Sequence, residues 1–168
     1  MIVVYIIIGL VLGLIFSFVF SFLRFPLKEI KRLNSSYLKE GKKLGEWKHA
    51  SDFVDHDYKE IVKPNCDTLY SYAFIDLSKS SFQLEFPEIK GYFSFAFLGK
   101  NTDVLGYITN RNYNGVRSFN LTARDKENSI RLETDVCWVI ARFGTEENGG
   151  VRGVNRIQKE LKLTAVNE

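Results

Sequence analysis

The sequence predicts a mainly β (α+β) protein, with an N-terminal transmembrane helix followed by a small antiparallel β-sandwich or barrel-like domain with a C-terminal helix. Three observations predict this fold class. The chain opens with a long uncharged apolar run, residues from about 61 onward alternate between apolar and polar with short turn-rich connections, and residues 151–161 return to helical spacing. Closely spaced strands joined by short polar turns are typical of antiparallel sandwiches and barrels rather than of alternating strand–helix units.

The composition excludes several other classes. Only 3 Pro and 12 Gly in 168 residues exclude a collagen-like or disordered chain, and 2 Cys exclude a disulfide-dense scaffold. A net charge of +3 is too small to indicate nucleic-acid binding. No internal repeat of about 20–50 residues is visible, which excludes a solenoid or propeller. The length therefore allows one domain beside the apolar run.

Residues 2–23 are expected to form a single-pass membrane anchor in the lipid bilayer. They carry no charge, and Ile, Val, Leu or Phe occupies 17 of the 22 positions. At about 1.5 Å per residue the segment is roughly 33 Å long, enough to cross a hydrocarbon core of about 30 Å. The alternative is a cleaved signal peptide, which needs a basic start, a shorter apolar stretch and a small-residue cleavage site. This segment lacks Lys and Arg before it and ends in Phe22-Leu23-Arg24-Phe25-Pro26, so a retained anchor is favoured.

Residues 24–48 form a basic juxtamembrane helix or linker, and residues 49–168 form the β-rich domain. The basic segment holds eight Lys and Arg against three Glu, a net charge of +5, whereas only the terminal amine lies on the other side of the anchor. Because basic residues accumulate on the cytoplasmic side of membranes, we expect the domain to be cytoplasmic. These cations also suit contact with anionic head groups, and such contact is compatible with a solvated helix face.

The anchor has one patterned face. Gly9, Gly13, Ser17 and Ser21 are its only small residues, and they recur at four-residue spacing. Such spacing keeps them on one helix face, where missing side-chain bulk lets another helix approach closely. The pattern predicts a transmembrane packing face, for a homodimer or for a membrane partner. Alternatively, it only reflects how common Gly and Ser are in membrane helices.

The remaining elements follow from periodicity. A short amphipathic helix is expected after Pro26, with apolar positions at Leu27, Ile30, Leu33, Tyr37 and Leu44 and an end at Gly41 or Gly45. Alternation predicts strands at residues 82–86, 92–98, 117–123 and 136–143, and residues 69–77, apolar on both faces, belong in a sheet interior. Helical spacing of Val151, Val154, Ile157, Gln158 and Leu161 predicts one C-terminal helix across a sheet face.

The densest polar run lies directly before the predicted buried strand. Asn65, Asp67, Thr68 and Tyr70 either face a pocket or serve the turn, since Asn and Asp side chains bond nearby backbone N–H groups. Both interpretations stay open from the sequence.

Other candidate sites are weaker. Asp52, Asp55, His56 and Asp57 resemble metal ligands by type, but they lack a recognisable ligand spacing and only His49 offers a second imidazole. We therefore expect a solvated loop, no metal and no cofactor. Cys66 and Cys137 form either a disulfide or two free thiols, and a cytoplasmic domain favours free thiols. The sequence has no Gly-rich phosphate loop and no nucleophile elbow.

The polar run also carries a family resemblance. Residues 65–71, Asn-Cys-Asp-Thr-Leu-Tyr-Ser, followed by Ile-Asp-Leu-Ser at 75–78, resemble the signature of the domain of unknown function 1254 family. The similarity continues through Pro87, residues 91–93, 103–111, Gly115 and 136–142, and ends with the helix reaching Gln158 and residues 161–163. It covers roughly residues 55–165, nearly the whole β-rich part.

The resemblance implies a partner rather than an activity. Larger relatives fuse this domain to a second one, the domain of unknown function 1214, in β-sandwich-rich architectures. It therefore implies that a separate protein carrying the second domain is a partner of this chain. The family carries no established activity and no agreed catalytic residues. Relatives of the fused type are often exported, which opposes the topology that the charges predict.

Two functions follow from the sequence. The leading hypothesis is a single-pass membrane protein whose domain is a binding or assembly module for a partner protein. The alternative is one half of an enzyme, with a pocket near residues 65–71 completed by a partner subunit. In that case Arg111 and Arg142 would join Asn65, Asp67 and Tyr70 as charge-stabilising and hydrogen-bonding groups. Convergence of Asp67 and Arg111 on a cavity would favour the enzyme, and Asp67 capping its own turn would favour the module.

Overall fold

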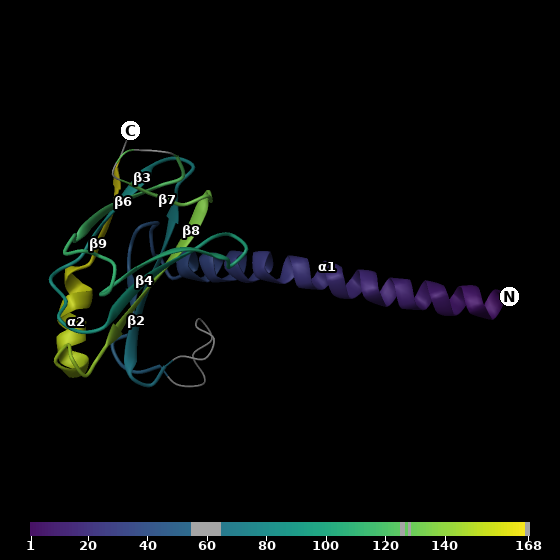
Figure 1. The fold of residues 1–168 in the computed structure, drawn as a ribbon, viewed down its shortest axis with the longest axis horizontal. Coiled ribbons are helices and arrows are strands. Elements are labelled where there is room, and N and C mark those ends of the chain that lie inside the picture. Colours follow the sequence, from purple (N-terminus) through teal and green to yellow (C-terminus); the bar gives the residue numbers. More distant parts are fainter. Residues whose placement is uncertain (55–64, 125–126, 128, 167–168) are drawn as a thin grey trace.

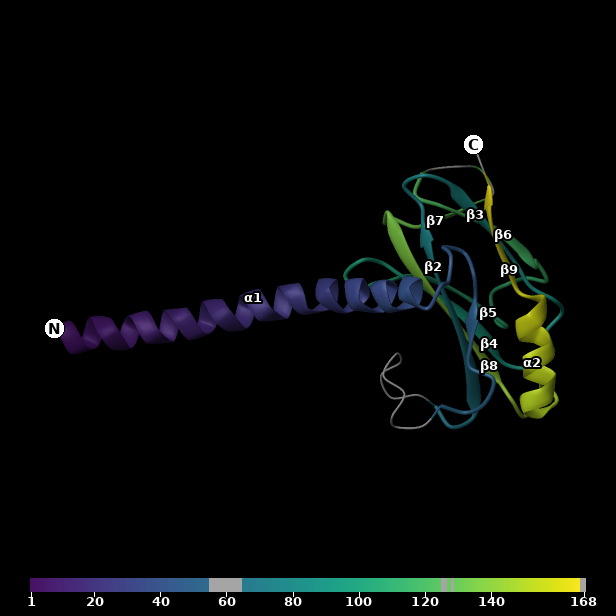
Figure 2. The same cartoon turned by 180° about the vertical axis from the view of Figure 1, so that it is seen from behind.

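A computed structural model describes residues 1–54, 65–124, 127 and 129–166. One long helix projects away from a β-rich body, and the second helix lies at the far side of that body (Figure 1; Figure 2). The elements in chain order are α1 (Ile2–Lys39), β1 (Lys48–His49), β2 (Thr68–Asp76), β3 (Ser81–Glu85), β4 (Phe93–Leu98), β5 (Val104–Thr109), β6 (Ser118–Thr122), β7 (Ser129–Arg131), β8 (Val136–Gly144), α2 (Gly150–Glu160) and β9 (Lys162–Val166).

The strands form two sheets, as the periodicity predicts. The first sheet has the order β1-β2-β8-β4-β5 and is antiparallel throughout, and we call it sheet A. The second, sheet B, has the order β7-β6-β3-β9 and contains one parallel pair, β6 with β7. The expected mainly β, sandwich-like fold with a C-terminal helix is confirmed.

The main core lies between the two sheets. Alternate residues of β4, namely Phe93, Phe95 and Phe97, are fully buried and pack with Leu84 and Leu121 from sheet B. The Phe at every second position of β4 therefore points inward, because successive side chains of a strand face opposite sides of the sheet. We call the side of sheet A that faces sheet B its inner face.

The opposite, outer face of sheet A is also covered in part. Tyr72 and Phe74 of β2 and Trp138 of β8 form a second buried cluster with residues of α1. Both faces of β2 and β8 are thus buried at this end of the sheet, which explains why residues 69–77 are apolar without alternation. The predicted interior strand is confirmed.

The helix α1 differs from the expected arrangement. We predicted a membrane helix and a separate short helix after Pro26, but a single helix runs from Ile2 to Lys39 with Pro26 inside it. Proline removes one helix hydrogen bond and costs about 3 kcal/mol in a helix interior. Packing of Ile30 and Leu33 on sheet A favours continuation of the helix beyond that point. Leu44, which we placed on the helix, lies beyond its end.

The last three turns of α1 are built into the domain. The side chains of Ile30, Leu33 and Tyr37 are buried on the outer face of sheet A. The Tyr37 hydroxyl donates to the Lys43 carbonyl at 2.6 Å and contacts the Glu46 carbonyl as well, which ties the helix end to the following segment. The apolar segment and the domain are therefore joined by one unbroken helix.

The C-terminal helix is confirmed, with a correction at its end. Val154 of α2 is fully buried in the core between the sheets, and Gln158 is 2% exposed. The helix ends at Glu160, however, and residues 162–166 form β9, which pairs with β3. The prediction that the helix reaches residue 163 is wrong. Leu163 lies in β9, and its side chain packs into the core between the sheets from that strand.

Candidate functional site

The cross-strand register places the polar residues of the early signature run on the outer face of sheet A. Tyr70 pairs with Arg142, and Thr68 pairs with Gly144. Arg142 in turn pairs with Ser94 of β4. Tyr70 shares its face with Tyr72 and Phe74, which alternate with it along β2. The outer face thus has an apolar end under α1 and a polar end where β2 begins and β8 ends.

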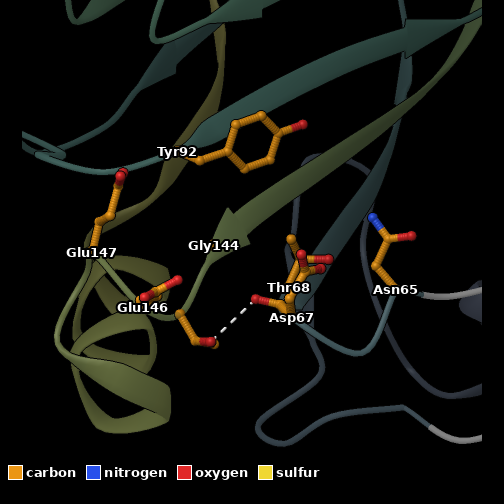
Figure 3. A pocket seen from close by; sticks show the side chains of 8 residues that line it. Asn65, Asp67, Thr68, Tyr92, Gly144, Glu146 and Glu147 are labelled. Carbon is orange, nitrogen blue, oxygen red and sulfur yellow. Dashed lines mark hydrogen bonds between the residues drawn. The ribbon is translucent and has the colours of Figure 1, made fainter.

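A cavity of about 330 Å³ lies at this polar end (Figure 3). Glu146 and Glu147 lie on one side of it, Asn65 and Asp67 on the other, and Tyr92 borders it between them. The described residues that line it are Asn65, Asp67, Thr68, Tyr92, Gly144, Thr145, Glu146 and Glu147. Its volume lies at the lower end of the range of about 300–1,000 Å³ typical of small-molecule pockets.

Asn148 fixes one wall of the cavity. Its Oδ1 accepts a hydrogen bond from the Gly91 backbone N–H at 2.9 Å, and its Nδ2 donates to the carbonyls of Gly144 at 2.8 Å and Tyr92 at 3.2 Å. The start of β4, the end of β8 and the turn before α2 are therefore held by one side chain.

Glycine at position 91 is required by this arrangement. A Cβ there would lie 2.5 Å from the Cβ of Glu147 and 2.9 Å from Nδ2 of Asn148, closer than real side chains come. Any larger residue would push the turn away and stretch the hydrogen bond from Gly91 to Asn148. The close packing of the cavity wall thus explains why glycine stands first in the Gly-Tyr-Phe block at residues 91–93.

The second wall is joined to the first through Thr145. Its backbone N–H and its hydroxyl both donate to the Asp67 carbonyl, at 3.0 and 3.1 Å. Because the Asp67 backbone makes these bonds, its side chain is not needed to hold the turn. Among the described residues, the Asp67 carboxylate has no hydrogen bond. The cavity is thus preformed by backbone contacts, and its side chains are left available.

The polar groups of the lining are mostly acceptors. Asp67, Glu146 and Glu147 supply carboxylates, and no Lys or Arg lines the cavity in the part of the chain that the structure describes. Thr68 is only 3% exposed, and its hydroxyl is buried without a hydrogen-bond partner within the described ranges. An unpaired buried hydroxyl costs about 1–3 kcal/mol, so a polar group that pairs with Thr68 from the cavity is favoured.

The six predicted site residues occupy three different places. Asn65, Asp67 and Thr68 line the cavity. Tyr70 lies behind them, buried, and its hydroxyl accepts a hydrogen bond from the Asn65 backbone N–H at 2.9 Å. The Arg142 guanidinium stacks over the Tyr70 ring at 5.8 Å and does not line the cavity.

Arg111 lies elsewhere. It is exposed in the turn after β5 and does not line the cavity. Asp67 does not meet Arg111 at the cavity, which was the arrangement expected of an enzyme. Its side chain does not cap its own turn among the described residues either, which was the arrangement expected of a binding module.

The remaining sequence candidates are also placed. Asp52 is exposed, and its carboxylate accepts a hydrogen bond from the Phe53 N–H at 2.8 Å. Asp55, His56 and Asp57 lie outside the described residues. Nδ1 of His49 lies 2.8 Å from the Ser71 hydroxyl. In the described part of the chain, no three His, Cys, Asp or Glu side chains gather where they could hold a metal ion.

The two cysteines are free and differ in environment. Cys66 is exposed next to the cavity residues Asn65 and Asp67, whereas Cys137 is buried in β8. Burial raises the pKa of the Cys137 thiol to about 12. Because the thiolate is the nucleophilic form, burial protects the Cys137 thiol from reagents, whereas Cys66 is accessible to them.

Sequence reasoning missed five of the eight described lining residues of the cavity. Tyr92, Glu146 and Glu147 line it, and Asn148 supports it, but none of them stands in the early signature run. The one available signal was the polar turn before the C-terminal helix, which ends in two adjacent glycines at 149 and 150. Nothing in that turn showed that it lies beside Asp67.

A comparison with models of known protein families shows which family the chain belongs to. The model of the family described as "Protein of unknown function (DUF1254)" matches residues 44–165. The chain belongs to the DUF1254 family. The matched range includes every cavity residue, and it leaves the apolar part of α1 outside. No curated protein matches the chain.

Two solved structures share the fold of this DUF1254 chain. One is the crystal structure of the VPA0106 protein from Vibrio parahaemolyticus, with a TM-score of 0.65, 11% identity and coverage of 86% of this chain and 36% of that one. The other is an uncharacterised protein from Burkholderia cenocepacia, with a TM-score of 0.53, 19% identity and coverage of 83% and 40%. This DUF1254 chain therefore spans about two fifths of the length of the structures it matches.

Proposed function

We propose that the protein is a single-pass membrane protein whose DUF1254 domain is a binding module for a partner protein. The observation that carries the proposal is the unbroken helix α1. Residues 1–25 are exposed throughout and apolar enough to span a membrane, while Ile30, Leu33 and Tyr37 of the same helix are buried in the domain. A domain joined in this way is held rigidly close to the lipid surface.

The membrane anchor is tested by extraction. We expect the native protein to stay in the membrane pellet in alkaline carbonate and to retain its N-terminal residues. Replacing Ile8 and Leu12 together with Lys costs about 2.5–3.5 kcal/mol per charge in the bilayer centre and should move the protein to the soluble fraction. Leu44→Lys, an exposed position on the domain, is the matched control. Release of the native protein, or a mature chain that begins after Phe25, would refute the anchor.

The partner is a separate protein carrying the domain of unknown function 1214. The support is twofold: the family resemblance implies this companion, and the solved structures with this fold are more than twice as long as the part they share with it. Packing of α1 against a second copy, through Gly9, Gly13, Ser17 and Ser21, is a further proposed contact. No atom lies within 4 Å of a Cβ built at Gly9 or Gly13, so this face is open.

We assign the partner to the β5 side of sheet A. Tyr107 pairs with Ala96, and Ala96 pairs with Ile140 of the outer-face cluster, so Tyr107 stands on the outer face. It is 53% exposed, and Val104 on the same edge strand is 48% exposed. Exposed aromatic side chains beside an edge strand are typical of protein-binding surfaces.

Co-purification from detergent tests this assignment. We expect a second polypeptide to accompany the full chain, and Tyr107→Arg to reduce its yield severalfold while Leu44→Arg leaves it unchanged. Recovery of a lone monomer, or an equal yield with Tyr107→Arg, would count against the partner surface.

The cavity favours a second candidate, one half of an enzyme. Asp67 and Thr68 border one polar cavity, and neither side chain makes a hydrogen bond among the described residues. A partner subunit could complete such a site by supplying the groups that this chain lacks. Loss of partner-dependent turnover in Asp67→Asn, with the partner still bound, would distinguish the enzyme from the module.

A further inference from the structure

We propose that the cavity between β2, β8 and the start of β4 binds a small organic ammonium ion, such as a primary amine or a diamine. The inference concerns the isolated chain, and it depends neither on the membrane anchor nor on the partner.

The charge of the lining selects the ligand class. Three carboxylates, from Asp67, Glu146 and Glu147, border the cavity, and none of its described lining residues is Lys or Arg. The two glutamates lie opposite Asp67 across the space (Figure 3). An anion would meet repulsion from both sides, whereas an ammonium group donates charge-assisted hydrogen bonds to carboxylates. A diamine has a cationic group for each side.

The Thr68 hydroxyl is the independent observation that points to a ligand. It lies at the cavity wall, 3% exposed and without a partner in the described residues. A hydroxyl can accept a hydrogen bond from an N–H donor, so an ammonium group entering the cavity satisfies it with a small side-chain adjustment. This hydrogen bond adds to the attraction between the ammonium group and the carboxylates.

Tyr92 supplies a surface suited to the same ligand. Its side chain borders the cavity between the acidic sides and is 41% exposed. The Tyr92 hydroxyl donates to the Ser94 hydroxyl at 3.3 Å, and Asn148 holds the Tyr92 backbone carbonyl. An ammonium ion near the face of a tyrosine ring gains about 0.5–1 kcal/mol at an exposed site. Arg142, two residues along β8 from Gly144, lies over the Tyr70 ring and is not among the described lining residues.

The test uses matched probes on the purified full chain in detergent. Isothermal titration with putrescine should show saturable binding at millimolar or lower concentration. The neutral analogue 1,4-butanediol and the anionic analogue succinate have similar length and should not bind. Added salt should weaken putrescine binding, because the attraction is between charges at a solvent-accessible site.

Variants assign the binding to this cavity. We expect Asp67→Asn and Glu147→Gln each to weaken putrescine binding about tenfold, and Thr68→Val to weaken it about threefold to tenfold. Glu160→Gln removes a carboxylate at the end of α2, away from the cavity lining, and should leave the affinity unchanged. Thr68→Val keeps the side-chain shape, so it serves as the test even if a charge variant folds poorly.

Four outcomes would overturn the proposal. They are no saturable binding of putrescine, equal binding of 1,4-butanediol, unchanged affinity in the folded cavity variants, and displacement of putrescine by an equal concentration of Ca²⁺. The last would indicate a plain divalent-cation site. Failure of membrane extraction or of co-purification would leave these titrations unaffected, so the two proposals fail separately.

Discussion

The backbone N–H of Gly91 donates a 2.9 Å hydrogen bond to the side chain of Asn148, which lies 57 residues further along the chain. This contact joins the start of β4 to the turn before α2. It explains why the position needs glycine and why an otherwise unremarkable Asn is placed beside the candidate pocket.

Asn148→Ala should destabilise the domain and loosen the cavity wall. The substitution removes three hydrogen bonds, to the N–H of Gly91 and to the carbonyls of Gly144 and Tyr92. Each bond contributes about 0.5–1.5 kcal/mol, so we expect the free energy of unfolding to fall by about 2–3 kcal/mol. Denaturant unfolding measures the change, and Asn101→Ala, in an exposed turn, is the control. Equal stability of the two variants would show that the bonds do not hold the wall.

Gln158→Met should separate α2 from the edge of sheet A. The Gln158 amide is buried and donates to the carbonyls of Ala50 and Tyr70, each at 3.1 Å. Methionine fills a similar volume but cannot donate a hydrogen bond. The Ala50 carbonyl then loses this donor, and the Tyr70 carbonyl keeps only its bond from the Ala50 N–H, which should lower the free energy of unfolding by about 1–2 kcal/mol. Lys159→Met, on the exposed side of the helix, should change it by less than about 0.5 kcal/mol. Thermal unfolding of both variants tests the prediction, and matching midpoints would contradict it.

Asn112→Ala should promote self-association. The Asn112 side chain accepts a hydrogen bond from the Thr109 N–H at 2.6 Å and donates to the Tyr107 carbonyl at 3.1 Å. It therefore covers backbone groups at the free edge of β5, where an added strand would otherwise pair. Light scattering in detergent should show larger species for Asn112→Ala than for the native chain. Asn110→Ala is the control, and a monodisperse Asn112→Ala protein would contradict the protective role.

The two cysteines should respond differently to a maleimide reagent. Cys66 is exposed and should react in the folded protein, whereas buried Cys137, with its pKa raised to about 12, should react only after unfolding. In intact cells, a reagent that does not cross membranes then reports the side on which the domain lies. We expect protection of Cys66, as the basic segment at residues 24–48 predicts a cytoplasmic domain. Labelling of Cys66 without cell disruption would reverse that topology.

Gly13→Ile combined with Ser17→Ile should weaken self-association of α1 in a membrane reporter assay. Both positions are exposed on α1, so the added side chains keep a neighbouring helix at a distance. Val11→Ile adds a methylene on another side of the helix and should leave the signal unchanged. An unchanged signal in the double variant would exclude a homodimer through this face.

The local pattern of apolar and polar residues was enough to predict those helices and strands whose surroundings stay the same over many residues. The uncharged run at residues 2–23, the alternation in β4 and the unbroken apolar stretch of β2 each reflect one constant surrounding over many residues. The short strands β1, β5, β7 and β9 escaped prediction because edge strands of two to six residues are paired on one side only and carry little periodicity. The sequence also did not predict that α1 continues through Pro26. Proline disfavours a helix interior locally, but the packing of Ile30 and Leu33 on sheet A outweighs that preference.

The candidate site divides in the same way. The amino-acid sequence alone determined a DUF1254-like domain, an apolar helix able to span a membrane, and a polar run containing Asn65, Asp67 and Thr68. Only the tertiary structure decided that Tyr92, Glu146 and Glu147 complete a cavity with that run, and that Arg111 stands apart from it. The physical reason is that strand register and the Asn148 hydrogen bonds join segments more than fifty residues apart, and no local pattern encodes which distant segments will meet.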